Sequence, residues 1–236
     1  MELHENPHCR RTFSGCIPAR DQRHLICMPK IGTRLALVTL FVCPGLLLAQ
    51  SAASLPARAA PAVYAKKLKL SGLPKFAQID DSLYRGAQPH ADGLQQLKKL
   101  GITTIVDLRG EDEGKAEWER KQAEALGMRF VHLPVSGWST PNDAQLAQFF
   151  SLFRANGNEK IFVHCRLGED RTGVFVAAYR MAFDHWSSER TLAEMVDFGF
   201  NRWFHPNMLA YVRAFPDHLR SAPILEGALL APGVVQ

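Results

Sequence analysis

Short apolar segments alternate with amphipathic segments through the middle of this 236-residue chain, and the alternation limits the folds it can adopt. The segments ITTIVDLRG (102–110), RFVHLPV (129–135) and KIFVHC (160–165) are rich in β-branched and aromatic residues, which predicts strands, with a shorter strand at 82–85. Helical patterns cover 92–100, 115–126, 141–154, 172–183, 188–198 and 206–219. The order predicts an α/β fold with a mostly parallel central sheet of four to five strands flanked by helices. Such sheets bind ligands at the carboxyl ends of their strands.

The formal net charge of +5 lies mostly at the N-terminus. Residues 1–53 hold six Lys or Arg and three acids, which leaves 22 basic and 20 acidic residues in the rest of the chain. This near balance gives no reason to expect a nucleic-acid partner.

An apolar run at 31–49 follows Lys30, contains Arg34 near its start, is interrupted by Pro44-Gly45 and precedes small residues. This pattern predicts a cleaved signal peptide and a periplasmic or secreted protein, with Met28 as an alternative start. An uncleaved membrane anchor formed by 31–49 is the alternative. The expected organisation is an N-terminal extension and signal peptide (1–53), a linker (54–75), one folded domain (76–220) and a C-terminal tail (221–236).

Removal of residues 1–53 leaves Cys165 as the single cysteine, so no internal disulfide is expected in an exported protein. Cys165 ends a predicted strand, and the loop 166–171 leads into a predicted helix. Gly168 allows a backbone turn in which the loop N–H groups converge, and the helix N-terminus adds positive potential. The same field that binds a phosphate dianion would stabilise a thiolate at Cys165, and Arg171 offers a planar fork for two phosphate oxygens.

The segment HCRLGEDRTG (164–173) resembles the signature His-Cys-x5-Arg-Ser/Thr of the cysteine-dependent protein tyrosine and dual-specificity phosphatases. Upstream, DDSLYRGAQP, GITTIVDLRGE and LGMRFVHLPV are similar to the atypical dual-specificity-like branch of bacteria, fungi and plants. The resemblance implies a tyrosine phosphatase-like fold and a two-step reaction through a phosphocysteine. Cys165 would attack phosphorus, Arg171 would bind the equatorial oxygens, the Thr172 hydroxyl would help the thiolate leave, and His164 would orient the loop from beneath. The remaining loop residues would contact the substrate, namely Arg166, Leu167, Gly168 and Glu169.

The resemblance does not settle which residue protonates the leaving oxygen. Many dual-specificity phosphatases carry an aspartate soon after the strand that ends in Leu-Pro, but Gly137 stands about there in this chain. Asp143 is one replacement, although Thr140, Pro141 and Asp143 also fit a helix start, with Thr140 as N-cap. Asp170, directly before Arg171, is the other and is favoured here, and its alternative is an ion pair with a nearby arginine.

Other side chains have alternative roles. Arg85 and Arg109 follow predicted strands and would either line the pocket rim and attract anionic substrate or be solvated arginines at strand ends. The alternative role for Asp107 is to buttress one of these arginines. Trp138 and Trp203 would form either a pocket wall or ordinary packing. His132 and His205 show no metal-ligand spacing and receive no role.

The expected function is hydrolysis of phosphotyrosine monoesters, with phosphoserine and phosphothreonine as further substrates. An inositol phosphate or phosphoinositide phosphatase that uses the same loop is the alternative. No cofactor, no metal, no nucleic acid and no stable membrane insertion after signal cleavage are expected, and the protein is expected to be a monomer.

Overall fold

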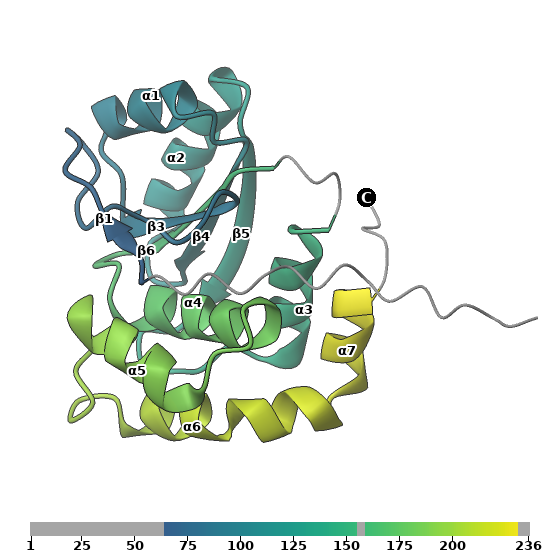
Figure 1. The fold of residues 1–236 in the computed structure, drawn as a ribbon. Helices are drawn as coiled ribbons and strands as arrows, with labels where there is room; N and C mark the ends of the chain where they lie inside the picture. Colours follow the sequence, from purple (N-terminus) through teal and green to yellow (C-terminus); the bar gives the residue numbers. More distant parts are fainter. Residues whose placement is uncertain (1–63, 155–158, 231–236) are drawn as a thin grey trace, which may run out of the picture. The chain divides into compact units, whose positions relative to one another are not determined.

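Six strands form one sheet in the order β1-β2-β3-β6-β4-β5 (Figure 1). The computed structural model describes residues 64–154 and 159–230. The strands are β1 (Lys66–Lys67), β2 (Ala77–Gln78), β3 (Leu83–Ala87), β4 (Thr104–Arg109), β5 (Arg129–Val135) and β6 (Ile161–Cys165). The helices are α1 (Ala91–Lys99), α2 (Glu113–Ala125), α3 (Asp143–Ser151), α4 (Asp170–Phe183), α5 (Ser188–Asp197), α6 (Pro206–Ser221) and α7 (Pro223–Leu230).

The central strand is β6, which pairs in parallel with β3 on one side and β4 on the other. Its five residues are all buried, in agreement with its apolar sequence. The ends of β3, β4 and β6 coincide, because Ala87 lies opposite Cys165 and Asp107 opposite His164. The carboxyl ends of three strands therefore meet where the sequence predicted a ligand.

Successive side chains along each strand point to opposite faces of the sheet, so the strands contribute to two apolar cores, one on each face. Ile105 and Phe162 belong to one apolar cluster, whereas their neighbours Val106 and Val163 belong to the other. Helices α1 and α2 cover the first face of the sheet, and α3 to α7 cover the second (Figure 1). The predicted mostly parallel α/β architecture is confirmed.

The strand number differs from the expected four to five because β1 and β2 are two-residue antiparallel strands, too short to give a sequence pattern. The described part of the expected linker, 64–75, contributes β1 and the buried side chain of Leu73. The described part of the expected tail contains α7, whose Leu225 is fully buried. Apolar side chains in both segments explain why they pack on the domain.

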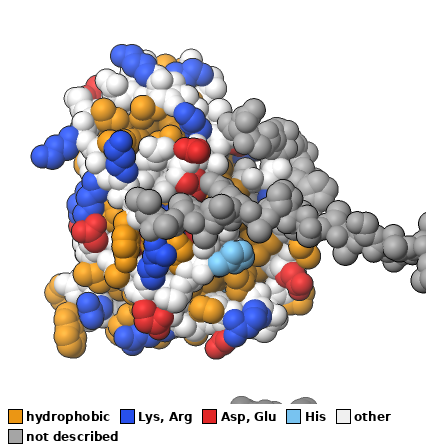
Figure 2. All heavy atoms as spheres, in the orientation of Figure 1, with side chains coloured by type: hydrophobic (Ala, Val, Ile, Leu, Met, Phe, Trp, Pro, Cys, Tyr) orange, Lys and Arg blue, Asp and Glu red, His pale blue; other side chains and the backbone are white. Residues whose placement is uncertain are grey.

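On the face drawn in Figure 2, Lys and Arg side chains are interspersed with Asp and Glu and do not form one continuous basic area. No helix in the described residues is both long and apolar enough to cross a membrane. The predicted signal segment, 31–49, lies outside the residues that the structure describes.

Candidate active site

Strand geometry sends His164 and Cys165, the last two residues of β6, to opposite faces of the sheet. His164 lies toward Glu119 of α2, and Cys165 belongs to the core cluster on the α4 face. The Cys165 residue is 2% exposed and is a free thiol. It therefore ends the central strand at the entrance to the loop that precedes α4.

The cysteine loop makes a hydrogen bond to the sulfur and packs closely against β3. The Gly168 N–H donates a hydrogen bond to Cys165 Sγ at 3.3 Å. Gly168 has φ +70°, and a β-carbon there would lie 2.5 Å from the carbonyl carbon and oxygen of Gly86 on β3. Because backbone atoms cannot move aside cheaply, the close approach and the left-handed conformation both require glycine.

The N-terminus of α4 lies immediately beyond this loop. The helix begins at Asp170, two residues earlier than the predicted Thr172, with Glu169 as its N-cap. The helix dipole and the Gly168 N–H both favour negative charge near the sulfur. The Thr172 hydroxyl is buried and has no hydrogen-bond partner among residues 64–154 and 159–230, which leaves it available to a group at the site.

Arg171 is oriented by a carboxylate that the sequence analysis did not assign. Its Nη1 and Nη2 donate to the two oxygens of Glu111 at 2.6 and 2.8 Å, and Nη1 also donates to the Val135 carbonyl at 3.1 Å. The hydrogen bond from Arg171 is the main reason that the pKa of Glu111 falls to about 2. These contacts occupy one edge of the guanidinium, so the Nε edge remains to bind phosphate oxygens. Glu111 has one sequence signal, its position just beyond the carboxyl end of β4.

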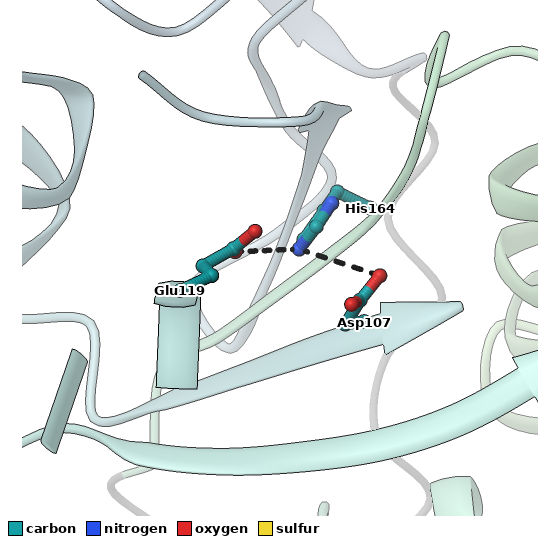
Figure 3. Close-up of side chains that lie close together, drawn as sticks. All are labelled: Asp107, Glu119 and His164. Atoms are coloured by element: carbon teal, nitrogen blue, oxygen red, sulfur yellow. Dashed lines mark ion pairs between the residues drawn. The ribbon is translucent and has the colours of Figure 1, made fainter. Parts of the chain in front are cut away.

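Beneath the loop lies a buried network of Asp107, Arg109, Glu119 and His164. Figure 3 shows its two carboxylates and the imidazole. His164 Nε2 is 2.8 Å from Glu119 Oε1 and 3.9 Å from Asp107 Oδ1. Burial opposes the charged imidazole, but the nearby Glu119 and Asp107 outweigh it and raise the pKa of His164. Arg109 donates to both carboxylates, to Asp107 Oδ1 from Nε at 2.8 Å and to Glu119 Oε2 from Nη2 at 2.7 Å. Asp107, Glu119 and His164 offer ligand atoms suited to a metal ion, but the Arg109 guanidinium already supplies the positive charge between the carboxylates.

Neither of the two arginines expected at the pocket rim is exposed. Arg109 is 2% exposed and binds both carboxylates of the network beneath the loop, although it also lines the pocket beside Arg166. Arg85 is fully buried, donates from Nη2 to the Gly168 carbonyl at 2.7 Å, and has its guanidinium carbon 4.0 Å from the Phe198 ring centroid. Burial lowers the pKa of Arg85 to about 10. The side chain supports the loop from below because the alternation of β3 directs it into the protein.

Asp170 lies at the loop, as predicted, and is close to a residue that received no role. Its Oδ2 is 3.4 Å from His205 Nε2. His205 precedes α6 and is far from Asp170 in the sequence, so no local pattern indicated the pair.

Asp143 makes different contacts. It is the first residue of α3, whose N-cap is Asn142 and not the predicted Thr140. The Asn142 side chain accepts from the Gln145 N–H, and Gln145 returns the bond in a capping box. Asp143 Oδ1 lies 2.7 Å from Nε2 of His218, a residue near the end of α6. His205, which contacts Asp170, and His218, which contacts Asp143, are about 20 Å apart along the axis of α6. This separation favours Asp170, which belongs to the cysteine loop, over Asp143.

The remaining candidate side chains of the sequence analysis lie at or near the surface of the protein. Arg166 and Leu167 are exposed, and Glu169 pairs with Lys75. Trp138 and Trp203 are 67% and 86% exposed. A pocket of about 330 Å³ adjoins the loop and is lined by Gln88, Arg109, Glu111, Asp112, Lys115 and Arg166.

Comparisons with known proteins agree with this geometry. The family model described as "DSP-PTPase phosphatase fused to NAD+ Kinase" matches residues 71–202. The dual specificity protein phosphatase TpbA of Pseudomonas aeruginosa (strain UCBPP-PA14) is 28% identical over 123 residues, which cover 52% of this chain and 54% of TpbA. The chain thus spans about half the length of TpbA. Human phosphatidylglycerophosphatase and protein-tyrosine phosphatase 1 is 22% identical over 162 residues, which cover 66% of this chain and 80% of the human protein.

Solved structures share the fold. P. aeruginosa TpbA in complex with pTyr superimposes with a TM-score of 0.56 at 26% identity, over 69% of this chain and 96% of that chain. The catalytic domain of the PP-IP phosphatase Siw14 from S. cerevisiae has a TM-score of 0.54 at 18% identity, over 69% of this chain and 98% of that chain. From the matched residues 71–202, which include the cysteine loop, it follows that this chain belongs to the DSP-PTPase family of cysteine-dependent dual-specificity phosphatases.

Proposed function

We propose that this protein is a phosphoric monoester hydrolase that acts on phosphotyrosine, and also on phosphoserine and phosphothreonine, through a phosphocysteine intermediate. The observation that carries the proposal is the Cys165 sulfur at the end of β6, within 3.3 Å of the Gly168 N–H and beside the N-terminus of α4. A thiolate in this position would be a nucleophile, and the Gly168 N–H and the dipole of α4 would also attract a phosphate dianion.

The reaction would proceed in two balanced steps. The Cys165 thiolate attacks phosphorus, the bond from phosphorus to the leaving oxygen breaks, and Asp170 gives its proton to that oxygen. Water then attacks the phosphocysteine, Asp170 takes a proton from the water, and the S–P bond breaks to release phosphate and the thiolate. Arg171 would stabilise the charge on the equatorial oxygens in both steps, and the Thr172 hydroxyl would donate a hydrogen bond to the leaving thiolate without giving up its proton.

An assay with p-nitrophenyl phosphate tests the proposal. We expect turnover in the presence of EDTA, because the amides and Arg171 supply the charge stabilisation that a metal supplies elsewhere. Cys165→Ser should abolish turnover while leaving the fold intact. Turnover by the serine variant at the wild-type rate would contradict the assignment of the nucleophile.

A second substrate class is supported by the relatives. Siw14 is named a PP-IP phosphatase and the human relative a phosphatidylglycerophosphatase. The exposed Arg166 and the adjacent pocket with Lys115 would suit a substrate with further phosphates, although Glu111 and Asp112 line the same pocket. A panel of phosphopeptides and inositol phosphates assayed with residues 54–236 distinguishes the two classes by their kcat/KM.

We also propose that residues 76–220 form the phosphatase domain, that residues 1–53 carry an export signal, and that the enzyme acts outside the cytoplasm as a monomer. The support for export is the sequence pattern of 31–49. The N-terminal sequence of the protein recovered from the periplasm or medium tests the cleavage, and retention in the membrane fraction would favour the anchor instead.

A further inference from the structure

A histidine and a tryptophan adjoin the favoured general acid. His205 Nε2 lies 3.4 Å from Asp170 Oδ2, and the His205 ring packs against Trp138 in a tilted arrangement, with 4.9 Å between centroids and 37° between the ring planes. The Phe200 ring also stacks on His205, with 6.3 Å between centroids. Two aromatic side chains therefore pack on the imidazole that faces the Asp170 carboxyl group.

The backbone of His205 is held by hydrogen bonds of both its N–H and its carbonyl group. Its N–H donates to the Asn201 carbonyl at 3.2 Å, and its own carbonyl accepts the Leu209 N–H at 3.1 Å at the start of α6. Trp138 is tied to the same helix, because Asn207 Nδ2 donates to the Trp138 carbonyl at 2.5 Å. These bonds hold the His205 backbone and the Trp138 backbone next to each other, and the ring contacts with Trp138 and Phe200 restrain the imidazole itself.

Burial makes the contact costly to lose. The His205 side chain is 11% exposed, and its Nδ1 is buried without a hydrogen-bond partner in the described part of the chain. Nε2 therefore provides the polar contact of this ring, and Asp170 is its partner. Among the other charged groups near Asp170, Lys75 is engaged by Glu169 and Arg171 by Glu111.

We propose that His205 is a positioning residue that holds the Asp170 carboxyl group for proton transfer, with Trp138 as the clamp that fixes the imidazole. This inference rests on the proposed phosphatase function. The loop that carries Gly137 and Trp138 would then contribute to catalysis through the contact of Trp138 with His205. The proton donor itself would be Asp170, which belongs to the cysteine loop. In the first step the Asp170 proton moves to the leaving oxygen, and in the second a water proton returns to Asp170. His205 keeps the carboxyl group in place in both steps and transfers no proton itself.

Two substitutions separate the contact of Nε2 with Asp170 from the packing of the ring. His205→Phe keeps an aromatic ring against Trp138 but removes the N–H, whereas His205→Gln keeps an amide N–H near the position of Nε2. The control is His218→Phe, which removes another histidine that pairs with an aspartate, at 2.7 Å, elsewhere on α6. The substrates are p-nitrophenyl phosphate, whose leaving group departs without protonation, and phenyl phosphate, whose leaving group needs a proton.

We expect His205→Phe to lower kcat for phenyl phosphate by about tenfold or more, while kcat for p-nitrophenyl phosphate and both KM values stay within about threefold. His205→Gln should restore most of the loss, and His218→Phe should leave both substrates unaffected. In an Asp170→Asn background, His205→Phe should add no further loss, because the two residues act as one unit. Trp138→Ala removes a largely exposed side chain and should give a smaller loss of the same selectivity.

Equal losses on both substrates, a glutamine variant no better than phenylalanine, or additive losses in the double variant would overturn the inference. A wild-type protein that does not hydrolyse p-nitrophenyl phosphate would instead refute the proposed function. Thermal unfolding of each variant is measured alongside. If His205→Phe does not fold, Trp138→Ala decides the question by its own substrate selectivity.

Discussion

Replacement of Gly168 by alanine tests whether the cysteine loop depends on close packing against β3. The new β-carbon would lie 2.5 Å from the Gly86 carbonyl carbon and oxygen and 2.6 Å from the Ala87 nitrogen. An ordinary contact would require the loop to move by about 1 Å, and a displacement of that size at a reacting centre costs about 100-fold in rate. The left-handed φ of +70° adds about 1–2 kcal/mol of strain for a residue with a β-carbon.

We therefore expect Gly168→Ala to lower kcat/KM for p-nitrophenyl phosphate by about 100-fold and to reduce the free energy of unfolding by about 1–2 kcal/mol or more. Steady-state kinetics and urea unfolding measure the two effects. The matched control is Gly227→Ala in α7, where a β-carbon meets nothing within 4 Å. A folded Gly168→Ala variant with activity within about threefold of wild type would refute the reasoning.

Three further substitutions address the support of the loop. Glu111→Gln should lower kcat/KM by weakening the orientation of Arg171. Because the folded-state pKa of Glu111 is about 2, below its ordinary 4.5, the stabilisation from this pair should be complete above pH 4.5 and disappear as the pH falls through about 2, which acid unfolding of wild type and variant measures. Glu119→Gln should cost about 3–5 kcal/mol of unfolding free energy, since it leaves a buried partner unpaired. Because the pKa of His164 is raised, that cost should be fully present below the ordinary value of 6.5 and decrease as the pH rises through the folded-state value; an equal cost at pH of about 5 and about 9 in urea unfolding would contradict the ion pair. Arg85→Met removes the hydrogen bond to Gly168 and should lower kcat/KM by about tenfold, and a variant as active as wild type would show that this buried arginine does not support the loop.

Local patterns were sufficient to predict the sheet and the cysteine loop. Strand β6 was expected at 160–165 and spans Ile161–Cys165, because five consecutive buried positions give a continuous apolar run. Helix α4 begins at Asp170, two residues before the expected start, and its N-cap Glu169 makes no side-chain capping hydrogen bond that the sequence could have signalled. The two-residue strands β1 and β2 are specified by pairing with β3 and leave no periodic signal of their own.

The residues that surround the loop were harder to predict because their contacts are nonlocal. Glu119 reaches His164 from α2, and His205 reaches Asp170 from the start of α6. Glu111 had a positional signal at the end of β4, but its bidentate contact with Arg171 depends on the way the loop places that arginine. The rim role expected for Arg85 assumed that a residue at the end of a strand faces solvent, whereas β3 is covered on both faces.

The central claim is that the sulfur of Cys165 carries the phosphoryl group during turnover. Rapid acid quenching during hydrolysis of p-nitrophenyl phosphate, followed by peptide mass spectrometry, measures this directly. We expect one phosphoryl group on the peptide that contains Cys165, and none on that peptide in Cys165→Ser. Steady turnover with the phosphoryl group on another residue, or undiminished turnover by the serine variant, would contradict it.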